Sequence, residues 1–179
     1  DQIITCTGVW TEELNPEIRL SPSRGTHLVI PSERLGHPTA SMTVAIPEEF
    51  GRFVFAIPQP DGLTYVGLTD LPTESLLPDP PEPTTEEIDW LCERISAALA
   101  VPLHSEDVIG TFSGLRPLVS DAHAQTADIS RKHLVARQPD GTIAVTGGKL
   151  TAYRKMAEDA VDLISGQPCP TTRIALVGA

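Results

Sequence analysis

The sequence predicts an α+β fold, in which an antiparallel sheet with a covering helix is flanked by parts of an α/β unit. Two observations predict it. β-Type runs with turn signals and one amphipathic helical pattern fill residues 20–115, and a strand–turn–helix pattern follows at 143–162. We therefore expect residues 1–19 and 116–165 to form the α/β part, with 166–179 as a proline-containing tail.

Composition places the chain among globular proteins with a real core. It has 179 residues, of which 40% are hydrophobic, and its longest apolar runs fall far below the roughly 18 residues that cross a bilayer. The formal net charge of −11 argues against nucleic acid and against docking on an anionic membrane surface. The chain opens on a β-type run with neither an initiator Met nor a signal-peptide pattern, which predicts a piece of a longer protein.

The three cysteines are odd in number and widely spaced: Cys6, Cys92 and Cys169. This spacing fits neither a zinc site nor a disulfide framework. It favours buried, small apolar side chains and a reducing, cytoplasmic context. No metal is predicted.

The N-terminal run is typical of a strand, because Ile3 to Cys6 is rich in β-branched residues and a small-residue turn follows at Gly8. The carboxyl end of such a strand is where open α/β sheets place ligands. An ordinary turn at Gly8 is the alternative.

Four further strands are expected in the antiparallel part: His27–Pro31, Met42–Pro47, Phe53–Pro58 and Leu63–Leu68. The last two are separated by a segment that ends in Asp61-Gly62, a pair that tolerates the positive φ of a tight hairpin turn. These patterns predict an antiparallel meander. Four prolines between Thr73 and Pro83 predict an exposed, extended linker.

A helix is predicted from Thr84, because Thr84 and Glu87 have the spacing of a capping box. Its apolar stripe, which we expect to pack on a sheet face, consists of Ile88, Leu91, Cys92, Ile95 and Leu99. Beyond it, residues 108–119 predict another strand. His133–Arg137 and Thr142–Thr146 predict a hairpin around an Asp-Gly pair.

The last β-type run meets Gly147-Gly148 and then a helical pattern. Glycines there let the backbone approach a ligand, and the first N–H groups of the helix favour an anionic or electron-rich group. Lys149 adds a positive charge and Thr151 a hydroxyl. A plain βα turn is the alternative. The apolar positions of the helical pattern are Leu150, Tyr153, Ala157, Val161 and Ile164.

Three basic residues stand at the edges of apolar segments: Arg116, Arg131 and Lys149. Arginine forks bind phosphate or carboxylate through two hydrogen bonds, and lysine supplies a point charge. Together they suit a small dianion in a pocket. The alternative is that each is a surface charge or the partner of one of the 24 acidic residues.

Six motifs spread over nearly the whole chain carry a resemblance to a known family. They are Thr7–Trp10, Ser23–Val29, Gly67–Asp70, Ser113–Leu118, Asp128–Arg131 and Gly147–Lys155. The Gly-Gly-Lys-Leu-Thr run, with Gly-Leu-Arg-Pro-Leu upstream, is specific. On these motifs the chain resembles the FAD-dependent glycerol-3-phosphate dehydrogenases, the quinone-linked flavoproteins of the wider glycine-oxidase-like family.

The resemblance implies FAD as the cofactor and assigns the two parts of the fold. Residues 1–19 and 116–165 would be the C-terminal part of an FAD-binding α/β domain, 20–115 the substrate-binding antiparallel sheet, and 166–179 a tail leading to a C-terminal domain that this chain lacks. The cofactor contacts that it implies are Thr7, Gly8, Trp10, Gly147, Gly148, Lys149, Leu150 and Thr151.

The resemblance also implies the reaction, the oxidation of sn-glycerol 3-phosphate to dihydroxyacetone phosphate with electrons passing to a quinone. Arg116, Arg131 and Lys149 would bind the phosphate and hydroxyls, with Thr151 beside them. The catalytic assignments are His27, Arg116 and Lys149. Histidine has an unperturbed pKa near neutrality, which suits a base, although a structural histidine is the alternative.

The chain departs from the family pattern in two places. Thr5-Cys6-Thr7 stands where many members have Asn-Ala before the turn, and no G-x-G-x-x-G fingerprint is present. Because the fingerprint is missing, we expect the isolated chain to be inactive. The cysteine spacing predicts a cytoplasmic parent enzyme, and its association with the inner face of the cell membrane is left open. The rival functions are an FAD-dependent amino-acid or hydroxy-acid oxidase and a non-catalytic interaction domain.

Overall fold

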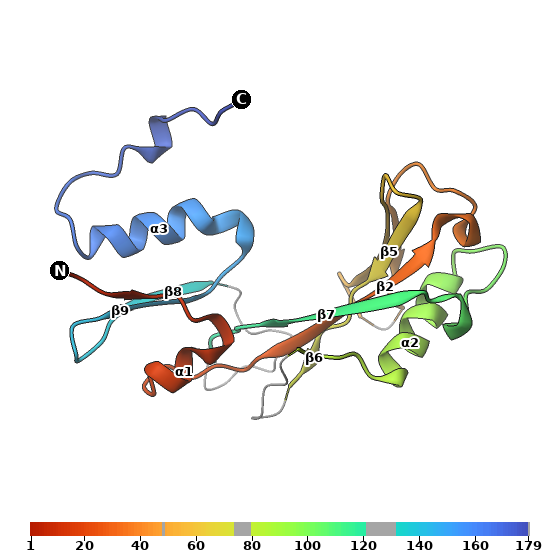
Figure 1. Ribbon diagram of the computed structural model, residues 1–179, viewed down its shortest axis with the longest axis horizontal. Coiled ribbons are helices and arrows are strands. Elements are labelled where there is room, and N and C mark those ends of the chain that lie inside the picture. Colours follow the sequence, from red (N-terminus) through yellow and green to blue (C-terminus); the bar gives the residue numbers. More distant parts are fainter. Residues whose placement is uncertain (48, 74–79, 121–131, 179) are drawn as a thin grey trace. The chain divides into compact units, whose positions relative to one another are not determined.

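The computed structural model describes residues 1–47, 49–73, 80–120 and 132–178 (Figure 1). The chain divides into two compact units, the first made of Asp1–Pro22 with Arg116–Ala179 and the second of Ser23–Leu115. Both units combine strands with a helix, which confirms the predicted α+β class. Each unit is described below by itself.

The second unit is built on a sheet of β2 (Ser23–Pro31), β3 (Met42–Ala45), β4 (Phe53–Pro58), β5 (Leu63–Gly67), β6 (Leu71–Pro72) and β7 (Gly110–Arg116). Its order is β3-β4-β5-β2-β6, and β7 also pairs with β2. Strands β3 to β5 form the expected antiparallel meander, but β2 pairs with β5 and not with β3. The simple meander was therefore wrong for β2, because a 3₁₀ turn at Ser32–Leu35 leads the chain away before β3 begins.

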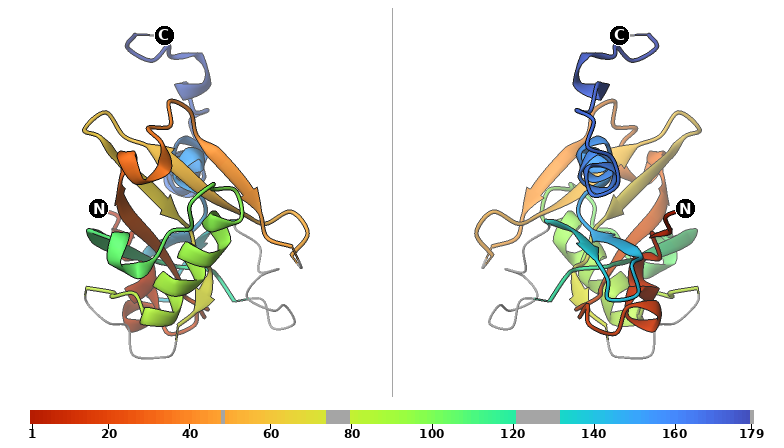
Figure 2. Two further views of the ribbon diagram at one scale, coloured as in Figure 1. Left: turned by 90° about the vertical axis from the view of Figure 1, so that its right-hand side faces the viewer. Right: turned by 90° about the vertical axis from the view of Figure 1, so that its left-hand side faces the viewer.

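Helix α2 (Thr85–Ser96) packs on one face of this sheet (Figure 2). The predicted capping box is confirmed, because the Glu87 N–H donates to Thr84 Oγ1 at 3.3 Å and the Thr84 N–H donates to Glu87 Oε2 at 3.0 Å. The predicted apolar stripe is confirmed too. Leu91 and Ile95 are completely buried against Leu28 and the rest of the core.

One carboxylate is buried between the helix and the sheet. Glu87 is only 2% exposed, and its Oε1 accepts hydrogen bonds from Thr26 Oγ1 at 2.9 Å and Thr69 Oγ1 at 2.8 Å. Its Oε2 pairs with Arg24 Nη2 at 2.7 Å. A buried charge is tolerated only when it is paired and hydrogen-bonded, so these contacts fix α2 to β2 and to the segment after β5.

The other face of the sheet is aromatic. Side chains alternate between the faces of a strand, so Leu28 and Ile30 point to α2 whereas His27 points away from it. His27 pairs in register with Gly67, and Tyr65 lies on the same face. The sequence predicted these strands but not which of their residues meet across the sheet.

The first unit contains a three-stranded sheet in the order β1-β9-β8, made of β1 (Ile4–Thr5), β8 (His133–Arg137) and β9 (Ile143–Gly147). The predicted hairpin is confirmed, because β8 and β9 pair antiparallel. Strand β1 runs parallel to β9. A 3₁₀ turn at Gly8–Trp10 and the short helix α1 (Thr11–Leu14) follow β1.

Helix α3 (Tyr153–Asp162) packs along β8 and β9 (Figures 1 and 2). Its apolar stripe lies on the exposed side, where Tyr153 is 58% and Val161 is 48% exposed. A 3₁₀ turn at Thr171–Arg173 lies in the tail. Among the helices that the structure describes, none has the length and apolar character that a membrane span requires.

Candidate functional site

Two loops meet at one edge of the sheet in the first unit. Strands β1 and β9 are parallel, so their carboxyl ends lie at the same edge, followed by the turns at Gly8 and at Gly147. Thr146 Oγ1 donates to the Gly8 carbonyl at 3.4 Å, and Thr11 Oγ1 donates to the same oxygen at 2.7 Å. The structure thus brings together the two turns that the sequence selected, at the edge where open α/β sheets bind ligands.

Local backbone conformation and packing explain why residues 147 and 148 are glycines, and the sequence did not reveal this explanation. Both residues adopt positive φ, +71° and +78°. A Cβ added at Gly148 would lie 2.8 Å from His133 Cβ and 3.1 Å from Met156 Sδ. Protein therefore fills the space beside this glycine, and the packing of the turn against β8 and α3 requires a residue without a side chain.

We expect Gly148→Ala to destabilise the protein by about 1–3 kcal/mol, because alanine disfavours positive φ and its methyl group would overlap His133. The midpoint of thermal unfolding measures this change. Gly166→Ala is the matched control, since no atom lies within 4 Å of its added Cβ and its φ is not positive. Equal midpoints for the two variants would contradict the packing argument.

Hydrogen-bond donors and a positive charge gather just after the glycines. A 3₁₀ turn at Leu150–Ala152 precedes α3, so the α-helix begins later than the sequence predicted. Lys149 is exposed and makes no ion pair with a described residue. Leu150 is 89% exposed, and its N–H and that of Thr151 donate to no residue that the structure describes. An electron-rich group is favoured here.

The remaining predicted contacts of this edge lie in the turn after β1. Thr7 is half-buried, and the Trp10 N–H donates to its carbonyl at 3.1 Å. Trp10 is 45% exposed. A Cβ added at Gly8 would meet nothing within 4 Å, in contrast to Gly148, so the backbone of this turn is open on one side.

His133 belongs to a cluster of polar side chains that sequence reasoning missed. His133 Nε2 lies 2.6 Å from Asp159 Oδ2, and Lys155 Nζ lies 2.8 Å from the other oxygen of that carboxylate. Hydrogen bonds from Lys155 and then from His133 lower the pKa of Asp159. The contacts join β8 to α3 beside Gly148. The sequence offered no signal for the contact between His133 and Asp159, because these residues belong to two different elements.

The predicted phosphate-binding residues are only partly described. Arg116 is the last residue of β7, where Pro117 follows without a backbone N–H, and its side chain is half-buried. Arg131 and the motif Asp128–Arg131 lie outside the described residues. Lys149 and Thr151 lie at the edge described above.

His27 lies in the second unit, within a cluster of aromatic rings. Its imidazole stacks on the ring of Phe112, with centroids 4.7 Å apart and an angle of 7° between the planes. Tyr65 meets Phe112 edge-on, with centroids 5.3 Å apart. Neither aromatic residue was singled out from the sequence, since they are distant from His27 along the chain.

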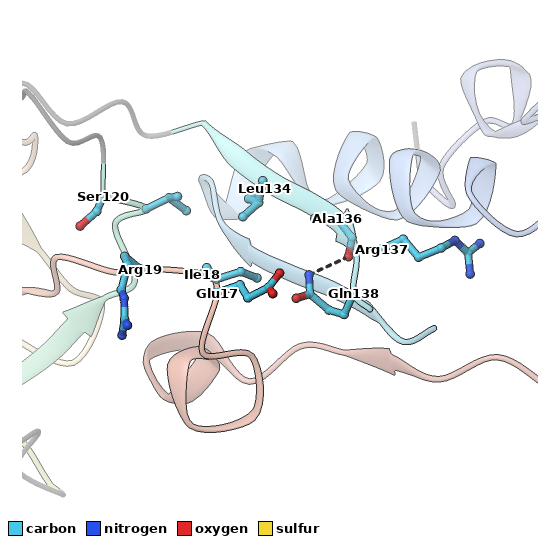
Figure 3. A pocket seen from close by; sticks show the side chains of 9 residues that line it. Glu17, Ile18, Arg19, Ser120, Leu134, Ala136, Arg137 and Gln138 are labelled. Atoms are coloured by element: carbon cyan, nitrogen blue, oxygen red, sulfur yellow. Dashed lines mark hydrogen bonds between the residues drawn. The ribbon is translucent and has the colours of Figure 1, made fainter. Parts of the chain in front are cut away.

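A separate cavity of about 660 Å³ lies in the first unit, between residues 17–19, residues 119–120 and the end of β8 (Figure 3). Arg19 beside it pairs with Glu12 at 3.2 Å. Arg137 points away, and its Nη2 donates to the Leu163 carbonyl at 2.6 Å. No predicted site residue lines this cavity.

Comparison with known proteins identifies the family. The family model described as FAD dependent oxidoreductase matches residues 1–154. The chain belongs to the FAD-dependent oxidoreductases. It is 44% identical, over 99% of its length and 36% of the relative, to Glycerol-3-phosphate dehydrogenase 1 of Mycobacterium tuberculosis. It is also 38% identical to the mitochondrial Glycerol-3-phosphate dehydrogenase SDP6 of Arabidopsis thaliana, over 94% of this chain and 27% of that protein.

The solved structures agree with this oxidoreductase family. The glycerol-3-phosphate dehydrogenase of Bacillus halodurans complexed with FAD superposes with a TM-score of 0.75 at 28% identity, covering 94% of this chain and 33% of that one. The glycine oxidase of Bacillus cereus shares the fold with a TM-score of 0.59 at 18% identity, over 92% of this chain and 43% of that one. The chain spans about a third of the length of the curated relatives it matches.

Proposed function

We propose that the whole protein oxidises sn-glycerol 3-phosphate to dihydroxyacetone phosphate with FAD as cofactor and a quinone as electron acceptor. The observation that carries the proposal is the 44% identity, over 99% of this chain, to a protein named glycerol-3-phosphate dehydrogenase. The FAD complex with the same fold supports the cofactor. The substrate is a small phosphate ester. We place the enzyme in the cytoplasm and assign any peripheral membrane association to the rest of the protein.

In this proposal the first unit is part of the FAD-binding domain. Its supporting feature is the edge formed by Gly8 and Gly147. The backbone of one turn is open there, and the other turn is followed by N–H groups that donate to no described residue. A positive charge at Lys149 and N–H groups favour the electron-rich edge of a flavin. The contacts come from Thr7, Gly8, Trp10, Gly147, Gly148, Lys149, Leu150 and Thr151.

The second unit is the substrate-binding domain of the proposal. Oxidation of the C2 alcohol removes one hydride and one proton; FAD, when bound, accepts the hydride, and His27 takes the proton. Arg116 and Arg131, which belong to the first unit of the chain, hold the phosphate and hydroxyls through paired hydrogen bonds. Lys149 of the same unit adds a point charge. Thr151 lies beside Lys149. The main contribution of these residues is to orient C2 for the transfer.

Anaerobic absorbance of the whole protein, before and after addition of sn-glycerol 3-phosphate, tests the proposal. We expect a bound flavin whose visible absorption band bleaches. A flavin that stays oxidised with this substrate and bleaches with an amino acid or hydroxy acid would move the enzyme to the oxidase class. Absence of flavin from the whole protein would leave only a non-catalytic role. The 179-residue chain alone is expected to be inactive.

A further inference from the structure

The imidazole of His27 is held on one side by aromatic rings. Phe112, on β7, lies nearly parallel to it at a centroid distance of 4.7 Å, which is the offset-stacked range for aromatic pairs. Tyr65, on β5, braces Phe112 edge-on, with an angle of 75° between the planes. Three strands therefore contribute one ring each to a cluster in which His27 and Phe112 stack and Tyr65 meets Phe112 edge-on.

The backbone of Gly67 holds the imidazole on another side. A Cβ added there would lie 2.9 Å from both Cγ and Nε2 of His27 and closer still to Cδ2. Gly67 does not have positive φ, so its conformation does not demand glycine. The reason for glycine at this position is the histidine ring, which occupies the space of the missing side chain.

Strands β2 and β7, which carry His27 and Phe112, are also joined by side chains on the opposite face of the sheet. Thr26 Oγ1 and Ser113 Oγ lie 2.8 Å apart, and Thr26 also donates to the buried Glu87. Thr26 and Ser113 are the chain neighbours of His27 and Phe112. Neighbouring residues of a strand point to opposite faces of the sheet. The hydrogen bond between Thr26 and Ser113 on the face toward α2 therefore holds the two strands in the register that stacks His27 on Phe112 on the other face.

The geometry points to Phe112 and Gly67 as positioning residues for His27, which fix the direction of its ring nitrogens. The inference rests on the proposed function, in which His27 accepts the proton of the C2 hydroxyl. A base must reach that proton within hydrogen-bond distance, and a displacement of about 1 Å costs about 100-fold in rate. Phe112→Leu removes the ring that stacks on the imidazole, and Gly67→Ala places a methyl group in the space that the imidazole occupies. Neither variant changes the chemistry of the imidazole itself.

Steady-state kinetics of the whole protein tests the inference. We expect Phe112→Leu and Gly67→Ala to lower kcat about 10- to 100-fold with little change in KM. Phe112→Tyr keeps the stack and should retain activity. Gly110→Ala is the matched control, because its Cβ would lie 3.8 Å from Val29, an ordinary contact, in the same sheet.

A double-mutant cycle separates positioning from general packing. In the His27→Asn background we expect Phe112→Leu to cause no further loss of kcat, because there is no imidazole left to orient. An equal loss in both backgrounds would overturn the inference and leave the proposed function intact. Failure of the wild-type protein to bleach with substrate would instead overturn the proposed function.

A spectroscopic readout tests the positioning independently of activity. The ring protons of His27 lie over the face of Phe112, so their NMR resonances should be shifted upfield in the wild-type protein. We expect them to move downfield in Phe112→Leu and to remain in place in Phe112→Tyr. Unchanged resonances in Phe112→Leu would contradict the stacked arrangement.

Discussion

Glu87→Ala should destabilise the second unit by about 3–5 kcal/mol, because it removes one partner of a buried ion pair and leaves Arg24 uncompensated. The carboxylate is 2% exposed and joins α2 to β2 and to the segment after β5. Chemical denaturation, monitored by circular dichroism, measures the change in the free energy of unfolding.

Glu93→Ala is the control for this experiment. Glu93 lies on the same helix but is exposed, so its replacement should change the free energy of unfolding by no more than about 0.5 kcal/mol. A loss in Glu87→Ala as small as that of the control would show that the pairing of Glu87 with Arg24 contributes little to stability.

The same carboxylate should make stability depend on pH. Burial raises the pKa of Glu87, but hydrogen bonds from the Thr84 N–H, from Thr69, Arg24 and Thr26 outweigh it, so the pKa is lowered from 4.5. A lowered pKa means that the stabilisation is fully present above the unfolded-state value and disappears as pH falls through the folded-state value. Glu87→Gln should flatten this acid limb relative to the wild-type protein.

Glu87 also shows which parts of the fold the sequence could predict. Its capping box with Thr84 is a local pattern, and the apolar stripe behind it follows from helical periodicity, so both were predicted. Its bonds to Thr26 and Thr69 join residues 61 and 18 positions away, and no local signal encodes such pairs. The same limit hid the pairing of β2 with β5.

In the candidate site, too, local patterns were predicted from the sequence and contacts between distant residues were not. The turns at Gly8 and Gly147 were predicted from small residues after β-type runs, and the parallel pairing of β1 with β9 places them at one edge. His27 was selected through a family motif, but its partner Phe112 lies on another strand and carries no motif signal of its own. The sequence assigned Gly148 to ligand approach, which stays a prediction, but it gave no sign of the contacts with His133 and Met156 that also require glycine there.

Lys149→Ala should lower kcat/KM for sn-glycerol 3-phosphate roughly 10- to 100-fold. A charge-assisted hydrogen bond contributes about 1.5–3 kcal/mol, and each 1.4 kcal/mol is about a factor of ten. Lys149 is exposed and makes no ion pair with a described residue, so its removal should leave the fold intact. Arg173→Ala, an exposed cation of the tail, is the control for a general change of charge.

The flavin content of Lys149→Ala separates the two roles proposed for this residue. If Lys149 binds the substrate phosphate, the variant keeps its flavin, its KM rises, and inorganic phosphate inhibits it less than the wild-type protein. If Lys149 acts only on the cofactor, the flavin content falls or the flavin spectrum changes, while phosphate inhibits the enzyme that keeps its flavin as strongly as it inhibits the wild-type protein. If both the kinetics and the flavin content were unchanged, Lys149 would not belong to the site. A cation after β9 that binds neither the substrate phosphate nor the flavin has no part in the reaction.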